Sequence, residues 1–190
     1  TKEEEVGEAY TAIVSQLGPL HGSINNAGMT RDGLLVKFKD GEFVKRMSLE
    51  EWQSVIDLNL TGVFLCGREA AQLMIESQSK GVIINISSVA RHGNFGQTNY
   101  SATKAGVQSM AVVWAKELSK YGIRVNSIAP GFINTEMVAS MPENVLEGLA
   151  KMIPLGRIGE PDEVAKAAEF IFENDYYSGR CIDLDGAQRL

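Results

Sequence analysis

Short apolar runs alternate with longer stretches of helical periodicity along this chain, and this alternation constrains the fold more than any other feature. The runs GVIINIS at 81–87 and IRVNSIA at 123–129 have the length and the β-branched content of buried strands. Strands that are separated by helices pair in parallel, because each helix carries the chain back along the sheet. The pattern therefore predicts an α/β fold, a parallel sheet with helices on both faces.

Caps and turn residues bound the expected elements. We expect strands at 21–28, 81–87, 123–129 and 180–186, and helices at 2–17, 48–57, 62–77, 101–120, 142–152 and 161–173. Ser48 and Glu51 form an S-x-x-E capping box, which marks the start of the second helix. No repeat or low-complexity linker interrupts residues 1–190, so we expect a single domain.

The composition argues against several classes of protein. The chain has 190 residues, of which 44% are hydrophobic and 22% charged, so it can bury a core and is not expected to be disordered. A net charge of −6 without a cluster of Lys and Arg argues against a nucleic-acid partner. The acidic N-terminus lacks the layout of a signal peptide, and no apolar run approaches the roughly 18 residues of a membrane span. We therefore expect a cytoplasmic protein.

The cysteines and histidines do not indicate a metal site. Cys66 and Cys181 lie far apart and form no C-x-x-C pair, so we expect both to be reduced packing residues. His21 and His92 are isolated from each other and from the cysteines. We expect no metal ligands among them.

Tyr100 and Lys104 stand four residues apart in the run GQTNYSATKAG, shortly after the expected strand at 81–87. On a helix, side chains at this spacing lie one turn apart. An ammonium group beside a phenol favours the phenolate, so the lysine would lower the pKa of the tyrosine from its usual value of about 10. Alone, this spacing is a weak signal, because a tyrosine and a lysine on a helix surface are common.

Four further motifs occur in the same chain in a fixed order. They are NNAG at 25–28, DLNLTG at 57–62, NISS at 85–88 and PGFINTEM at 130–137. Together with Tyr100 and Lys104 they resemble the short-chain dehydrogenase/reductase family, and within it the 3-oxoacyl-[acyl-carrier-protein] reductases. The resemblance extends over about residues 3–190. It implies a Rossmann-like, doubly wound sheet whose motifs meet in one crevice beyond the carboxyl ends of the strands.

The resemblance also implies roles for individual side chains. Tyr100 would give a proton to the developing alkoxide and would contact both the substrate and the cofactor, while Lys104 would lower the pKa of this tyrosine and bind the nicotinamide ribose. Asn59 would hold a water that leads from Lys104 to solvent; alternatively it is a structural residue that kinks a helix.

A serine hydroxyl would hydrogen-bond the substrate oxygen, and two serines compete for this role. Counted forward from the strand, NISS favours Ser88, whereas the family's commoner spacing to the tyrosine points to Ser87. Adjacent strand residues face opposite ways, so only one can point at the substrate, and we favour Ser88. Asn94 and Gln97 would line the same loop on the substrate side.

Two segments resemble the family's cofactor-binding turns. In the first, Asn26, Ala27 and Gly28 would lie near the ribose, or the NNAG turn would brace the sheet. In the second, the residues that would lie along the nicotinamide and its phosphate are Pro130, Gly131, Ile133 and Thr135. A plain structural turn is the alternative for this segment.

The sequence departs from the family pattern at its start. A domain of this topology opens with a strand, a glycine-rich turn and a helix, and none of these is present. We infer that the first two βα units, about 60 residues at about 30 each, are absent from this sequence. It would thus hold the C-terminal three-quarters of the family domain. An incomplete sequence is our interpretation, and a natural minimal enzyme is the alternative.

Three further segments suggest additional features. Lys39 to Glu42 reads as the tip of a hairpin, inserted relative to the acyl-carrier-protein reductases, either as plain surface or as a rim at the substrate entry. An apolar stretch resembles the family's lid, or packs in the core; it comprises Met137, Val138, Met141, Leu146, Leu149 and Met152. Two helices carry apolar stripes that are wider than one sheet face needs: Ala70, Ala71 and Met74 on the first, and Ala105, Met110, Val113 and Trp114 on the second. We expect at most half of each stripe to be buried in the monomer. The rest would pair subunits in a homotetramer, a dimer of dimers.

Taken with the resemblance, the motifs predict an NAD(P)-dependent oxidoreductase that reduces a 3-oxoacyl thioester to its 3-hydroxyacyl form, as in fatty-acid biosynthesis. We expect NADPH rather than NADH as cofactor, with acyl carrier protein as a partner. One alternative is a short-chain alcohol, sugar or steroid dehydrogenase. Another is a non-catalytic fragment or structural subunit that lacks the cofactor phosphate site.

Overall fold

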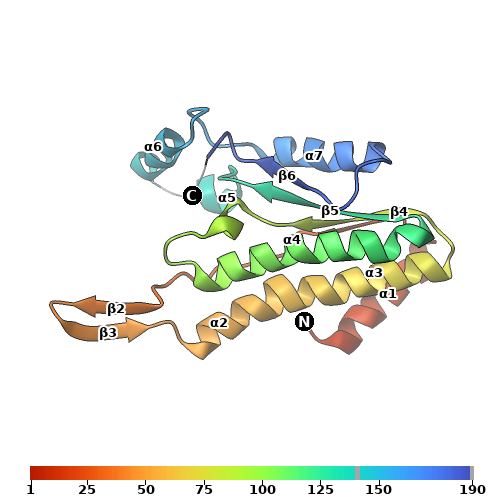
Figure 1. The fold of residues 1–190 in the computed structure, drawn as a ribbon, viewed down its shortest axis with the longest axis horizontal. Helices are drawn as coiled ribbons and strands as arrows, with labels where there is room; N and C mark the ends of the chain where they lie inside the picture. Colours follow the sequence, from red (N-terminus) through yellow and green to blue (C-terminus); the bar gives the residue numbers. More distant parts are fainter. Residues whose placement is uncertain (140–141, 189–190) are drawn as a thin grey trace.

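Four parallel strands form the central sheet of the computed structural model, which describes residues 1–139 and 142–188 (Figure 1). The strands are β1 (Gly22–Asn25), β4 (Gly81–Ile86), β5 (Ile123–Pro130) and β6 (Cys181–Leu184), and they lie in the order β1-β4-β5-β6. Each strand pairs in parallel with its neighbour, as Ile24 does with Ile84 and Ile84 with Asn126. The predicted α/β fold with a parallel sheet is therefore confirmed.

Helices cover both faces of this sheet. They are α1 (Glu3–Leu17), α2 (Leu49–Ile56), α3 (Gly62–Glu76), α4 (Thr98–Leu118), α5 (Glu136–Ala139), α6 (Glu143–Met152) and α7 (Pro161–Glu173). Ile83 points to one core, formed with α3 and α4 through residues such as Met74 and Ala111. Its neighbours Val82 and Ile84 point the other way and pack against Ile171 of α7. This alternation along β4 is what a strand buried on both faces requires.

The helices α2 and α3 form one continuous rod, because a π-helical turn at Asp57–Thr61 joins them. The predicted capping box starts this rod: the hydroxyl of Ser48 accepts from the amide of Glu51, whose carboxylate accepts from the amide of Ser48. A π turn inserts one extra residue and re-aims the side chains within it, a feature frequent at functional sites. Here it turns Asn59 inward, where this side chain is fully buried.

The inserted segment forms an isolated β-hairpin, as predicted. Strands β2 (Val36–Lys39) and β3 (Glu42–Arg46) pair antiparallel around Asp40 and Gly41, both at positive φ. This Asp-Gly pair is the usual sequence of a tight hairpin turn. Figure 1 shows the hairpin projecting beyond the N-terminal end of α2, and every residue of both strands is exposed. Whether it shapes substrate entry stays a prediction.

Several bounds differ from those predicted. Helix α4 begins at Thr98, three residues before the expected 101. The short helix α5 was not expected, and two 3-10 turns, η2 (Val89–His92) and η3 (Ser119–Tyr121), flank α4. Of the apolar stretch resembling a lid, Met141 lies outside the described residues, and α6 buries none of its residues. Packing in the core therefore does not explain this stretch within α6.

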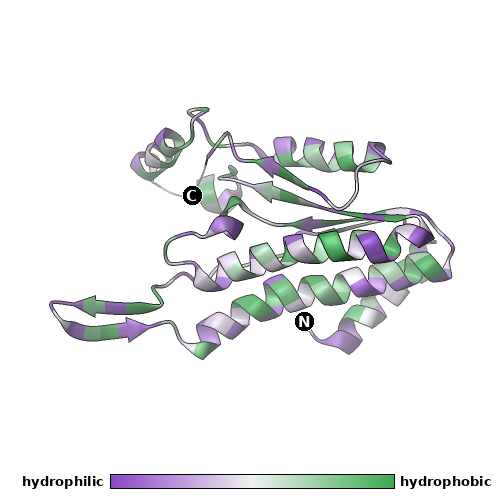
Figure 2. Cartoon of the chain, in the orientation of Figure 1, coloured by the Kyte–Doolittle hydropathy of each residue, from purple (hydrophilic) through white to green (hydrophobic). Residues whose placement is uncertain are grey.

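The prediction that half of each helical stripe at most is buried in the monomer is wrong for α3. Ala70, Ala71 and Met74 are all buried against the sheet and α4. On α4, by contrast, Val113 is 47% exposed, and Phe64 of α3 is 42% exposed beside it along the same groove. Figure 2 shows hydrophobic residues along the outer surfaces of both helices. Of the two predicted stripes, the part that stays exposed among the described residues is this outer face.

Candidate active site

Three of the predicted motifs, NNAG, NISS and PGFINTEM, meet at the carboxyl ends of β1, β4 and β5, where they line one cleft of about 740 Å³ together with Tyr100 and Lys104. A parallel sheet brings these ends to one edge, although the motifs are far apart in sequence. The cleft is lined by these predicted residues: Asn26, Gly28, Ser87, Ser88, Tyr100, Lys104, Pro130, Gly131, Ile133 and Thr135. Ala27, Asn59, Asn94 and Gln97 are not among its lining residues.

Tyr100 lies in the first turn of α4 and is half-buried at the wall of the cleft. Burial raises the pKa of its phenol above the ordinary 10.0, a hydrogen bond with the side chain of Ser88 lowers it, and the negative charge of Asp32 raises it. The net shift is upward. Tyr100 is therefore a protonated phenol at neutral pH, held beside a serine hydroxyl.

Lys104 lies one turn further along α4 and is only 4% exposed. Its Nζ donates to the carbonyl oxygen of Ile86 at 2.7 Å and lies 5.5 Å from the centroid of the Tyr100 ring. Burial lowers the pKa of this lysine to about 8. The lowered pKa predicted for Tyr100 is not found in this structure: Lys104 is not among the groups that shift it, and burial of the phenol outweighs the lowering by Ser88.

The side chains of the two candidate serines, which directly follow β4, have different partners. The Oγ of Ser87 turns away and donates to the carbonyl oxygen of Lys104 at 2.6 Å, which ties β4 to α4. Ser88 instead lies beside Tyr100, whose pKa its side chain lowers, and its Oγ accepts from the amide of Ala90 at 3.1 Å. The geometry favours Ser88 as the hydroxyl that faces the cleft.

Asn59 braces the turn that follows β1. Its Oδ1 accepts from the amide of Met29, and its Nδ2 donates to the carbonyl oxygen of the same residue, each at 2.9 Å. Nδ2 also reaches Thr103 Oγ1 at 3.4 Å. The amide group of Asn59 is thus fully engaged with protein atoms. These contacts favour the structural alternative for its side chain, and a role in a water chain stays a prediction.

The NNAG turn combines a brace with an open approach to the cleft. Asn25 donates to Asn85 Oδ1 at 2.8 Å, a buried bond between β1 and β4. Gly28 faces Asn59 and Lys104, because a Cβ atom there would lie 3.4 Å from Asn59 Oδ1 and 3.6 Å from Lys104 Nζ. The absence of a side chain at Gly28 therefore leaves Lys104 accessible from the cleft.

The segment after β5 is held against the loop that precedes α7. Gly159 donates to the carbonyl oxygen of Phe132 at 2.9 Å, and Asn134 donates to that of Gly159 at 2.7 Å. A Cβ at Gly131 would approach the Cα of Asp185 to 2.9 Å, so only glycine fits there. These contacts leave Thr135 exposed at the rim of the cleft.

Asn94 and Gln97 lie beside the cleft and are engaged with each other. Asn94 Nδ2 donates to Gln97 Oε1, and Gln97 Nε2 donates to Asp32 Oδ2, each at 2.9 Å. A direct substrate contact for these two side chains stays a prediction. The sequence reading missed Asp32, whose charge acts on Tyr100, and Arg91, which contacts Ser88. The local sequence contained no signal for either, because both act through contacts between distant segments.

Replacing Lys104 with methionine is expected to stabilise the fold at neutral pH. The folded-state pKa, about 8, lies below the ordinary 10.5, so the unfolded chain binds more protons between these values. The free energy of unfolding therefore rises with pH across this window, and the cost of the buried ammonium, about 3 kcal/mol, is fully present below about pH 8. Loss of the hydrogen bond to Ile86 offsets about 1 kcal/mol, which leaves a gain of about 2 kcal/mol at pH 7.

Denaturant unfolding at pH 7 and at about pH 10.5 measures this gain, which should vanish at the higher pH. Lys116→Met, at an exposed position on the same helix, is the matched control and should change stability by less than about 0.5 kcal/mol. A Lys104→Met variant that is less stable than the wild type at pH 7 contradicts the expectation.

Both cysteines are free, as predicted. Within residues 1–139 and 142–188, no group of three or more His, Cys, Asp or Glu side chains could hold a metal ion. No helix in the same residues is long and apolar enough to cross a membrane.

Several known proteins are similar in sequence to this chain. A family model described as enoyl-(acyl carrier protein) reductase matches residues 1–186. The 3-oxoacyl-[acyl-carrier-protein] reductase FabG of Thermotoga maritima is 43% identical over 189 residues, which cover 98% of this chain and 73% of that protein. The (3R)-3-hydroxyacyl-CoA dehydrogenase of Canis lupus familiaris is 44% identical over 166 residues, 86% of this chain and 61% of that protein. Carbonyl reductase family member 4 of Xenopus tropicalis is 37% identical across the whole chain and 75% of its own length.

Proposed function

The chain belongs to the short-chain dehydrogenase/reductase family, and on that premise we propose that the whole protein reduces the keto group of a 3-oxoacyl thioester with NADPH. The observation that carries this proposal is the cleft shared by Tyr100, Ser88 and Lys104. The similarity of the chain to 3-oxoacyl-[acyl-carrier-protein] reductases supports the choice of substrate.

The residues of the cleft fit a nicotinamide cofactor. A cleft of about 740 Å³ lies within the range of cofactor pockets, which are largely apolar with a few polar groups. Ile24, Ile133 and Val164 supply apolar wall, while Gly28 leaves Lys104 approachable. We propose that Asn26, Ala27 and Gly28 lie along the ribose. Along the nicotinamide and its phosphate we propose Pro130, Gly131, Ile133 and Thr135. When bound, the cofactor supplies the hydride.

The side chains of the chain manage the proton in this proposal. Tyr100 keeps its phenolic proton at neutral pH, since burial raises its pKa, and this suits a general acid in the direction of ketone reduction. Ser88 would donate to the substrate oxygen as negative charge develops on it. Lys104, with a pKa of about 8, is mostly an ammonium at neutral pH and would hold the ribose hydroxyls and stabilise the negative charge left on Tyr100 after its proton is transferred.

A second function uses the same site in the opposite direction. The (3R)-3-hydroxyacyl-CoA dehydrogenases are similar to this chain at 43–44% identity, so oxidation of a 3-hydroxyacyl-CoA is the competing proposal. A single assay set decides between them. The full-length protein is given 3-oxoacyl groups on acyl carrier protein or on coenzyme A with NADPH or NADH, and the hydroxyacyl-CoA with the oxidised cofactors.

We expect the highest kcat/KM with the acyl-carrier-protein thioester and NADPH. A preference for NADH with hydroxyacyl-CoA contradicts this and supports the competing proposal. Activity only with simple alcohols, sugars or steroids contradicts both.

We also propose that the protein is a homotetramer in which the outer face of α3 and α4 pairs two subunits. Phe64 and Val113 are exposed on this face and line one apolar groove together with Met110 and Trp114. An unpartnered apolar face of this kind favours an isologous contact. Light scattering of the full-length protein measures the assembly: a tetramer that Val113→Glu dissociates supports the proposal, and a monomeric wild type contradicts it.

A further inference from the structure

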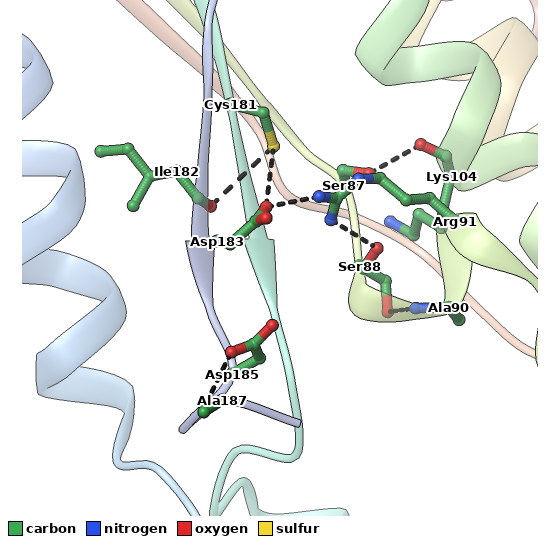
Figure 3. Close-up of polar contacts among 10 residues, drawn as sticks. All are labelled: Ser87, Ser88, Ala90, Arg91, Lys104, Cys181, Ile182, Asp183, Asp185 and Ala187. Carbon is green, nitrogen blue, oxygen red and sulfur yellow. Dashed lines mark hydrogen bonds and ion pairs between the residues drawn. The ribbon is translucent and has the colours of Figure 1, made fainter. Parts of the chain in front are cut away.

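An ion pair between the nearly buried Arg91 and the more exposed Asp183 ties the loop that carries Ser88 to the distant strand β6. We propose that Arg91 and Asp183 are positioning residues for Ser88, which they hold in place by clamping its backbone. The inference rests on the proposed function, in which the hydroxyl of Ser88 serves the reaction. Figure 3 shows the cluster, with Arg91 reaching from the loop after β4 to Asp183 on β6.

Arg91 donates two hydrogen bonds to the carbonyl oxygen of Ser88. The amide of Arg91 donates to the carbonyl oxygen of Ser88 at 3.1 Å, which closes the 3-10 turn η2. The guanidinium group returns to the same oxygen, because Nη1 donates to it at 3.2 Å. The position of the Ser88 carbonyl is therefore coupled to the position of one guanidinium group.

Asp183 determines where that guanidinium group lies. Nη2 of Arg91 is hydrogen-bonded and ion-paired with Oδ1 of Asp183. The side chain of Arg91 is only 6% exposed, and its Nε has no hydrogen-bond partner among the described residues. A nearly buried charge with so few partners depends strongly on the carboxylate that it has. Without Asp183, the guanidinium group would move toward solvent and release Ser88.

The turn that Arg91 closes also orients the hydroxyl of Ser88. Its Oγ accepts from the amide of Ala90, inside the turn that Arg91 closes, and lies close enough to Tyr100 to lower the pKa of the phenol. A shift of the turn would therefore move the hydroxyl relative to Tyr100. Displacements of about 1 Å at such a group can lower a rate by up to about 10²-fold.

The competing interpretation is that the ion pair only fastens β6 to the rest of the fold. A double-mutant cycle with Ser88 separates the two, because a positioning residue acts only through the group that it positions. In the full-length protein, Arg91→Met is expected to lower kcat for 3-oxoacyl reduction about 10- to 100-fold, with KM for NADPH changed less than about twofold. Asp183→Asn, which keeps an oxygen acceptor, should have a smaller effect in the same direction.

In the Ser88→Ala background, Arg91→Met should cause almost no further loss of kcat. Arg180→Met is the matched control: it removes an exposed arginine next to β6 and should leave kcat unchanged. An equal loss of kcat from Arg91→Met with and without Ser88 overturns the proposal, as does an unchanged kcat in the single variant.

Hydrogen exchange provides a readout that does not depend on activity. The amides of Ala90 and Arg91 bond to Ser88, so both should exchange at least about 10-fold faster in Arg91→Met than in Arg180→Met. If the wild type reduces no 3-oxoacyl thioester, the proposed function fails while faster exchange still supports the clamp. Unchanged exchange at both amides overturns the clamp even in an active enzyme.

Discussion

Tyr100→Phe is expected to lower kcat for 3-oxoacyl reduction by about 10²- to 10⁴-fold, the range of general-acid catalysis by a positioned side chain. The substitution removes only the phenolic oxygen, so the ring still packs at the start of α4 and the apolar wall of the cleft is kept. The Kd for NADPH should therefore change less than about threefold, because the ring of Tyr100 is kept and most contacts proposed for the cofactor come from other residues. Steady-state kinetics and a fluorescence titration of the full-length protein measure the two quantities.

Tyr121→Phe is the matched control for this prediction. Tyr121 follows α4 in the turn η3, is 44% exposed and contacts Lys120 at its ring face. Loss of its hydroxyl should leave kcat unchanged. A Tyr100→Phe enzyme with wild-type kcat refutes the role of Tyr100 as the proton donor.

Ser88→Ala is the second large effect, with kcat expected to fall by about 10²- to 10³-fold, the typical loss when one donor to a developing oxyanion is removed. The adjacent Ser87 has a different environment, because its hydroxyl donates to the carbonyl oxygen of Lys104 within the fold. Ser87→Ala should therefore lower the free energy of unfolding by about 1 kcal/mol, with a much smaller effect on kcat.

Each serine variant is the control for the other, because Ser87→Ala and Ser88→Ala each remove one hydroxyl and the two positions are adjacent. Kinetics and denaturant unfolding are measured on both. If Ser87→Ala loses the larger part of kcat while Ser88→Ala retains it, the assignment from the strand alternation is reversed.

The elements with strong local signals were predictable from the sequence. The helix α7 has the predicted bounds, because Pro161 starts it and the apolar periodicity ends at Glu173. The hairpin follows from Asp40 and Gly41, whose positive φ values make a tight turn favourable. The shared edge of the sheet follows from the order of strands and motifs, since parallel strands end on the same side.

Features that depend on burial were not predictable. The spacing of Tyr100 and Lys104 suggests a lowered tyrosine pKa, but the sign depends on how much solvent the phenol loses, which a motif does not contain. The sequence also does not show that Ala111 on α4 packs against α3, and the stripe on α3 is therefore predicted as an interface although it lies in the core.

Contacts between distant segments were equally hidden. Arg91 and Asp183 are 92 positions apart, and the pairing of β4 with β5 and of β5 with β6 brings them together. The π turn at Asp57–Thr61 also has no local sequence code, yet it places Asn59 against the turn after β1.

The central claim is that the cleft at the carboxyl edge of the sheet transfers a hydride from the nicotinamide ring to the keto carbon of a 3-oxoacyl thioester. The most direct measurement uses the full-length protein, NADPH that carries deuterium at both C4 positions of the ring, and acetoacetyl-CoA. Mass spectrometry of the product should show one deuterium bonded to carbon 3 of the hydroxyacyl chain in the wild type, and very little product in Tyr100→Phe. A product without deuterium at this carbon, or equal product from both enzymes, would contradict the account.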